Sequence, residues 1–97
     1  MNVEITDTDK AGFIKFVYNS YFPDSTKIKE QYKRKTDITS INLIKYGNTE
    51  CLEMIYETNK SSYFINTVSD NFFTVDSVNG IAPTSLNDLK DKILALL

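Results

Sequence analysis

The chain has 97 residues, a formal net charge of −2 and one cysteine, so it fits a single domain, residues 1–97, and cannot close an intrachain disulfide. Hydrophobic residues make up 41% of the chain and charged residues 25%, which excludes a disordered chain. No stretch reaches about 18 consecutive apolar residues, and the N-terminal residues lack the apolar stretch of a signal peptide. We therefore expect a cytoplasmic protein with no membrane partner.

The N-terminal third predicts helices. Residues 3–5 favour a short edge strand, and Asp7 and Thr8 are typical N-cap residues for a following helix. Five apolar residues then recur at helical spacing: Ala11, Ile14, Val17, Tyr18 and Tyr21. This pattern predicts a helix over residues 8–22, ending before Pro23, and a shorter surface helix follows over residues 26–35.

The middle of the chain predicts a sheet. From Asp37 onward, β-branched and aromatic residues alternate with short turns, which predicts strands over residues 39–46, 50–57, 62–68 and 72–78. Turns this short favour antiparallel hairpins and hence a four-stranded meander. Alternation in the second strand places Leu52 on the core side.

The C-terminal segment is the clearest helix. Ser85 and Asp88 are spaced as in a capping box. Leucine and isoleucine follow at helical spacing: Leu86, Leu89, Ile93, Leu96 and Leu97. The predicted fold class is therefore α+β: an N-terminal helix with a short second helix, a four-stranded antiparallel β-meander, and a C-terminal helix packed on the sheet.

Several classes of enzyme are excluded by composition. The chain has no histidine, which removes Ser-His-Asp and Cys-His nucleophiles and His-ligated metal sites, and Cys51 alone cannot hold a structural zinc. Glu53, Glu57 and Asp76 are the carboxylates from which an acid-dependent site would be built. A solvated sheet face is the strongly preferred interpretation of these residues, so we expect no enzyme, no catalytic residue, no metal and no cofactor.

A basic segment spans residues 27–35. It contains five cations opposed only by Glu30: Lys27, Lys29, Lys33, Arg34 and Lys35. Tyr32 lies among them and has a ring on which a base can stack. Short charge clusters are usually solvated surface, and an acidic protein is at least as good a partner as a nucleic acid.

Aromatic residues are dense in the predicted first helix. Phe13, Phe16, Tyr18, Tyr21 and Phe22 fall within ten residues, and one helix face buries only part of such a set. Burial of two sides of this helix, against the sheet and the C-terminal helix, is the favoured interpretation. In the alternative, Phe13 and Phe16, or Tyr18 and Phe22, are left exposed as anchors for a partner protein or for a second copy of the chain.

The predicted function is a non-catalytic protein-binding module. Ten lysines against one arginine, with ten isoleucines and nine asparagines, indicate A/T-rich codons and thus a low-GC bacterium or its phage as the source. The exclusion of catalysis, together with the aromatic and charged residues, then favours a small accessory or inhibitor protein of such an organism. Immunity proteins and inhibitors of host defence, including anti-CRISPR proteins, are examples. A nucleic-acid-binding accessory protein acting through residues 27–35 is the alternative. The predicted partner-binding residues are Phe13, Phe16, Lys29, Tyr32, Lys33, Arg34, Lys35, Glu53 and Glu57.

Overall fold

The computed structural model describes residues 2–19, 29–67, 69 and 72–97. In this part of the chain it shows seven strands, one short 3-10 helix and one α-helix. The elements in chain order are β1 (Asn2–Asp7), β2 (Phe13–Asn19), β3 (Lys29–Arg34), η1 (Lys35–Asp37), β4 (Ile38–Tyr46), β5 (Thr49–Tyr56), β6 (Lys60–Ile65), β7 (Phe73–Val78) and α1 (Leu86–Leu96).

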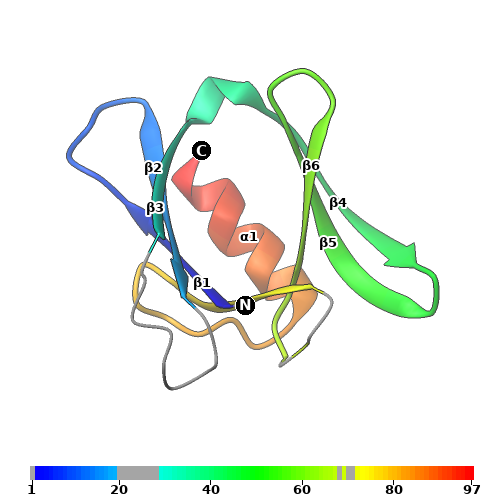
Figure 1. Ribbon diagram of the computed structural model, residues 1–97. Helices are drawn as coiled ribbons and strands as arrows, with labels where there is room; N and C mark the ends of the chain where they lie inside the picture. Colours follow the sequence, from blue (N-terminus) through cyan, green and yellow to red (C-terminus); the bar gives the residue numbers. More distant parts are fainter. Residues whose placement is uncertain (1, 20–28, 68, 70–71) are drawn as a thin grey trace.

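The strands form one mixed sheet in the order β3-β2-β1-β7-β6-β5-β4. β7 pairs in parallel with both β1 and β6, and the other neighbouring strands are antiparallel. The sheet curves around α1, which lies in its hollow (Figure 1). β3 and β4 are the two edge strands, and η1 connects them.

The core lies between the hollow of the sheet and α1. Leu89 and Ile93 of the helix are fully buried, as are Phe16 of β2 and Phe64 of β6. The rings of Phe16 and Phe64 stack with their centroids 6.2 Å apart, which joins the two halves of the sheet. The helix is amphipathic, because polar residues such as Asn87 and Asp91 are exposed on its outer side.

The predicted helix over residues 8–22 is wrong. The described residues of this range form the β1–β2 turn and strand β2, in which Ile14, Phe16 and Tyr18 are buried and alternate with half-buried residues. These apolar residues fit a period of two as well as a helical period, and pairing with β1 selects the strand. Gly12, with φ of 80°, occupies the turn.

The predicted second helix is also wrong where the structure describes it, because Lys29–Arg34 is strand β3. Lysine, glutamate, glutamine and arginine are good helix formers, but six residue pairs with β2 override that preference. The other predicted residues, 26–28, and the predicted turn at Pro23 lie outside the described residues, as does Lys27.

The predicted meander is wrong in its connectivity. Four strands occur close to the predicted ranges, but only β4, β5 and β6 form a meander. β7 leaves that order and pairs in parallel with β6 through Phe64–Phe73 and Ile65–Thr74. A short connection suffices because β7 begins beside the point where β6 ends. β7 lies between β6 and β1 and joins the two halves into one seven-stranded sheet. The fold is therefore mostly β, and the predicted α+β class is wrong.

Three local predictions are confirmed. The C-terminal helix begins after Ser85, whose Oγ accepts a hydrogen bond from the Asp88 backbone N–H at 3.0 Å. The Leu52 side of β5 faces the core, with Leu52 fully buried. The strand at residues 3–5 exists as β1, although it lies inside the sheet instead of at an edge. None of the helices in the described residues has the length and apolarity to span a membrane.

Candidate functional site

Two hollows meet along edge strand β3, and we call their combined surface the β3 groove. The first, about 330 Å³, is lined by Phe13, Gln31, Tyr32, Lys33, Arg34, Asp37, Tyr56 and Glu57. The second, about 350 Å³, is lined by Tyr18, Lys29, Gln31, Tyr56, Ser61, Ser62 and Phe73. Gln31 and Tyr56 belong to both, so the two hollows form one continuous surface.

The register between β2 and β3 decides which side chains enter the groove. Lys29 and Lys33 lie opposite the buried residues Tyr18 and Ile14, so both lysines project from the inner face of the sheet. An inner face is normally apolar at such positions. β3 instead offers polar side chains on its inner as well as its outer face.

Lys33 spans the groove. Its Nζ lies 3.8 Å from the centroid of the Tyr56 ring and 5.6 Å from that of Phe16. The contact with Tyr56 joins β3 to β5, and four strands lie between these two in the sheet order. A lysine ammonium over an aromatic face is attracted by the ring quadrupole, and this holds the side chain across the inner hollow.

A second cation–aromatic cluster lies on the outer side of β3. Lys10 Nζ is 4.2 Å from the Phe13 centroid and 5.9 Å from that of Tyr32, while Arg34 Cζ is 5.7 Å from Phe13. Tyr32 is 48% exposed and Phe13 is half-buried. Both faces of the edge strand therefore combine cations with accessible aromatic rings.

Four of these cations form no ion pair in the described part of the chain, although Lys33 lies close enough to Glu57 to contribute to the lowered pKa of that carboxyl. Among the described residues, no carboxylate lies within 4.0 Å of Lys10, Lys29, Lys33 or Arg34, as the described ion pairs involve other lysines. These pairs are Lys15–Glu30 at 3.8 Å, Lys35–Asp7 at 3.9 Å, Lys60–Glu57 at 2.8 Å and Lys92–Asp88 at 3.2 Å.

The η1 end of the groove is acidic. Asp37 and Glu57 both line it, and the Glu57 backbone N–H donates to the Asp37 carbonyl at 2.8 Å. The hydrogen bond from Lys60 lowers the pKa of the Glu57 carboxyl. The groove is thus basic along β3 and negative at the end where β3 continues into η1.

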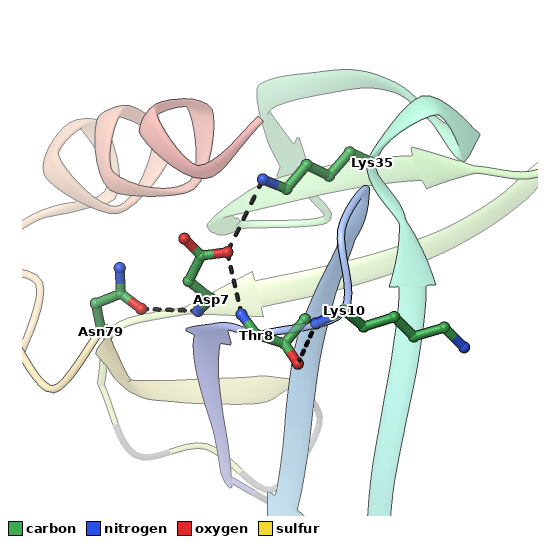
Figure 2. Close-up of polar contacts among 5 residues, drawn as sticks. All are labelled: Asp7, Thr8, Lys10, Lys35 and Asn79. Atoms are coloured by element: carbon green, nitrogen blue, oxygen red, sulfur yellow. Dashed lines mark hydrogen bonds and ion pairs between the residues drawn. The ribbon is translucent and has the colours of Figure 1, made fainter.

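Lys35 has a structural contact. Figure 2 shows its side chain reaching toward Asp7, whereas Lys10 extends away from that carboxylate. The backbone N–H of Lys35 also donates to the Gly12 carbonyl at 2.9 Å. Asp7 in turn receives a 3.0 Å hydrogen bond on Oδ1 from the Thr8 N–H. These contacts fix the start of η1 against the β1–β2 turn.

The groove brings together most of the predicted partner-binding residues: Phe13, Lys29, Tyr32, Lys33, Arg34 and Glu57. Phe16 is fully buried beneath Lys33 and belongs to the core. Glu53 pairs with Tyr63 of β6 and is not in the groove lining. Sequence reasoning missed Lys10, Gln31, Asp37 and Tyr56. Tyr56 does share the alternation of Leu52, but that pattern places it in the core and gives no sign of a groove.

The residues considered for a catalytic or metal site do not lie together in the structure. Cys51 is buried, and burial raises the pKa of its thiol. The structure puts β6 between Glu53 on β5 and Asp76 on β7, and Asp76 accepts a hydrogen bond from the Asn2 side chain. In the described part of the chain no group of three His, Cys, Asp or Glu residues is placed to hold a metal ion.

No protein-family model, no curated protein and no solved structure matches the sequence, so the function is inferred from the groove itself.

Proposed function

We propose that the chain is a non-catalytic protein-binding module that receives an extended, acidic segment of its partner along β3. The observation that carries this proposal is the set of four cations around an edge strand, Lys10, Lys29, Lys33 and Arg34, which form no ion pair among the described residues. The proposal is also supported by the unpaired backbone of β3, by the charge of the strand and by the aromatic walls of the groove.

The backbone of β3 offers the first point of attachment. No other described strand pairs with its outer edge. An edge strand presents unpaired N–H and C=O groups, which an added strand satisfies by main-chain hydrogen bonds. The six residues of β3 give a docking length of about 20 Å at the usual rise per residue.

Charge selects the segment that is added. A strand lying beside β3 projects alternate side chains to the two faces of the sheet. Lys29 and Lys33 meet those on the inner face, and Arg34 and Lys10 meet those on the outer face. Carboxylates on either face of the partner are therefore attracted, and basic strands are repelled.

Charged edge strands also protect proteins against aggregation, and this simpler role fits β3 as well. The groove adds features that protection does not require. Tyr32 remains 48% exposed, and Lys33 is held over Tyr56 on the opposite wall. Aromatic rings and arginine are the residues that interfaces concentrate. A basic edge that binds uncharged strands weakly and acidic strands tightly protects against aggregation and still binds the partner.

The wider role that we propose is that of a small accessory or inhibitor protein in a low-GC bacterium or its phage, of the immunity or anti-defence type. The codon-biased composition supports the source. Occupying an acidic segment of another protein is a direct way for a small domain without catalytic groups to block that protein. The pathway follows from the identity of the partner.

A nucleic acid is the second candidate ligand, favoured by the exposed Tyr32 ring among cations. One observation favours an acidic protein segment over it. The edge of β3 presents backbone carbonyls, which complement the N–H groups of a polypeptide and have no counterpart in a phosphate backbone.

The test uses a fluorescent peptide in which glutamate alternates with valine, and its glutamine analogue, titrated by anisotropy against the whole chain. We expect the glutamate peptide to bind, and the glutamine analogue to bind about tenfold more weakly. K33A with R34A removes two cations and is expected to weaken binding about tenfold. K45A with K90A removes the same charge elsewhere and leaves binding unchanged.

Two results would overturn the proposal. One is equal loss of peptide binding in the two double variants, which would mean that only net charge matters. The other is a labelled single-stranded oligonucleotide that binds with strong salt dependence while the glutamate peptide does not. That second result would mean that the ligand of the β3 groove is a nucleic acid.

A further inference from the structure

The two edges of the sheet differ sharply in charge. β3 carries four charged residues in six positions, whereas β4 carries one, Lys45, in nine. Natural edge strands are commonly protected by charges, prolines or bulges. β4 has one irregularity, between Ile38 and Ser40, and pairs regularly with β5 from Ile41 to Tyr46. This long, nearly uncharged edge is exposed unless a strand covers it.

Apolar side chains accompany the β4 edge on its surface. Leu43 is 43% exposed and Tyr46 is 58% exposed. A hollow of about 430 Å³ beside the strand is lined by Leu43 and by Leu86 at the start of α1, among other residues. In Figure 1 the β4–β5 hairpin extends away from the helix and the rest of the sheet, so its tip is accessible to another molecule.

We propose that β4 is the contact between two copies of this chain, which pair antiparallel through their β4 edges. This surface is separate from the β3 groove and independent of the function proposed for it. A two-fold axis at Asn42 aligns the strand with its own copy. It sets Ile41 opposite Leu43 of the second copy on the inner face. Lys45 lies on this same face and comes opposite Thr39 of the second copy.

The charge pattern is what favours a second copy. No like charges meet in β4 self-pairing, because Lys45 faces a threonine. The same operation on β3, with the axis at Gln31, places Lys29 opposite Lys33 of the second copy, which is repulsive. Pairing two β4 edges uses the same surface on both copies, so the assembly closes as a dimer. The resulting sheet leaves a basic β3 edge at each end.

Sedimentation velocity from micromolar to millimolar concentration tests this assembly. We expect a species of twice the 11.1 kDa chain mass. Asn42 is exposed, and N42K places two lysines directly opposite each other across the axis. This change is expected to weaken dimerisation about fivefold. N42E is expected to do the same, and an equimolar mixture of N42K and N42E should restore a mixed dimer.

The β3 variant K33A with R34A is the matched control and should dimerise like the unaltered chain. A monomer at every concentration would overturn the proposal. So would a dimer that N42K and N42E leave unaffected, because its contact would then lie elsewhere. Loss of dimerisation in the β3 variant alone would also overturn it and assign the contact to the β3 groove.

Discussion

Lys33 Nζ lies 3.8 Å from the centre of the Tyr56 ring, and this contact joins edge strand β3 to the end of β5 across the groove. The two residues belong to strands that do not pair with each other. The contact therefore connects the two walls of the proposed binding surface. The same ammonium forms no ion pair within 4.0 Å among the described residues and interacts with Glu57 only at longer range, so it can still pair with an acidic ligand.

The Lys33–Tyr56 contact is expected to stabilise the fold measurably. A double-mutant cycle with K33M, Y56L and the double variant should give a coupling of about 0.5–1 kcal/mol in urea unfolding. Y56F keeps the ring and should retain the coupling. A coupling of zero with Y56L, or equal losses for Y56F and Y56L, would show that the ring does not hold the lysine.

The turn at Asn79 and Gly80 is expected to be sensitive to substitution. Both residues have positive φ, 50° and 79°, and Asn79 Oδ1 accepts a hydrogen bond from the Asp7 N–H at 2.8 Å. G80A should cost about 1–2 kcal/mol because Ala is strained at this φ. N79G keeps the conformation and loses the acceptor, so a smaller loss for N79G than for N79A in denaturant unfolding separates the two effects.

The N-cap of α1 is expected to contribute to stability. Ser85 Oγ accepts from the Asp88 N–H at 3.0 Å. S85A should lower the free energy of unfolding by about 1 kcal/mol, since it leaves a helix N–H without its partner. S85D restores an acceptor and should recover most of that loss. Equal stability of S85A and the unaltered chain in urea would contradict the capping role.

Protonation of the Asp88 carboxyl at acid pH is expected to lower the stability of the fold. A hydrogen bond from the Thr84 backbone N–H, followed by one from Lys92, lowers the pKa of Asp88. Because the folded pKa is lower than the unfolded one, the stabilisation is present above about pH 4 and is lost as pH falls through the folded pKa. Thermal unfolding of D88N should therefore differ from that of the unaltered chain at neutral pH and converge with it at acid pH.

Tyr18 is expected to ionise only at strongly alkaline pH. Burial, and to a lesser extent Tyr56 nearby, raises the pKa of its phenol to about 12. The folded state then binds a proton that the unfolded state loses near pH 10, so stability falls between about pH 10 and 12. Phenolate absorbance of the folded protein should show a late step that Y18F removes. A late step that survives in Y18F would contradict this assignment.

The elements most readable from sequence were those with unambiguous patterns. β5 follows from its alternation, and β4 follows from its β-branched residues and the Gly47-Asn48 turn that ends it. The C-terminal helix follows from Ser85 and the leucine stripe. β2 was misread because Ile14, Tyr18 and their neighbours satisfy the helical period as well as the period of two. β3 was misread because its lysines, glutamate and glutamine favour helices, and only its pairing with β2 makes it a strand.

The groove was partly predictable for the same reason. The basic residues around Lys33 can be recognised in the sequence because they are closely spaced. Tyr56 does not, because its place on the opposite wall depends on the curvature of a seven-stranded sheet. Local patterns do not encode that curvature, nor the parallel position of β7 that brings the two halves together.

Hydrogen exchange of the β3 amides, followed by mass spectrometry with and without the glutamate peptide, tests the central claim most directly. Strand addition predicts that exchange in Lys29–Arg34 slows when the peptide binds, while exchange in β4 does not change. Peptide binding that leaves the β3 amides at their free rates would contradict strand addition at this edge.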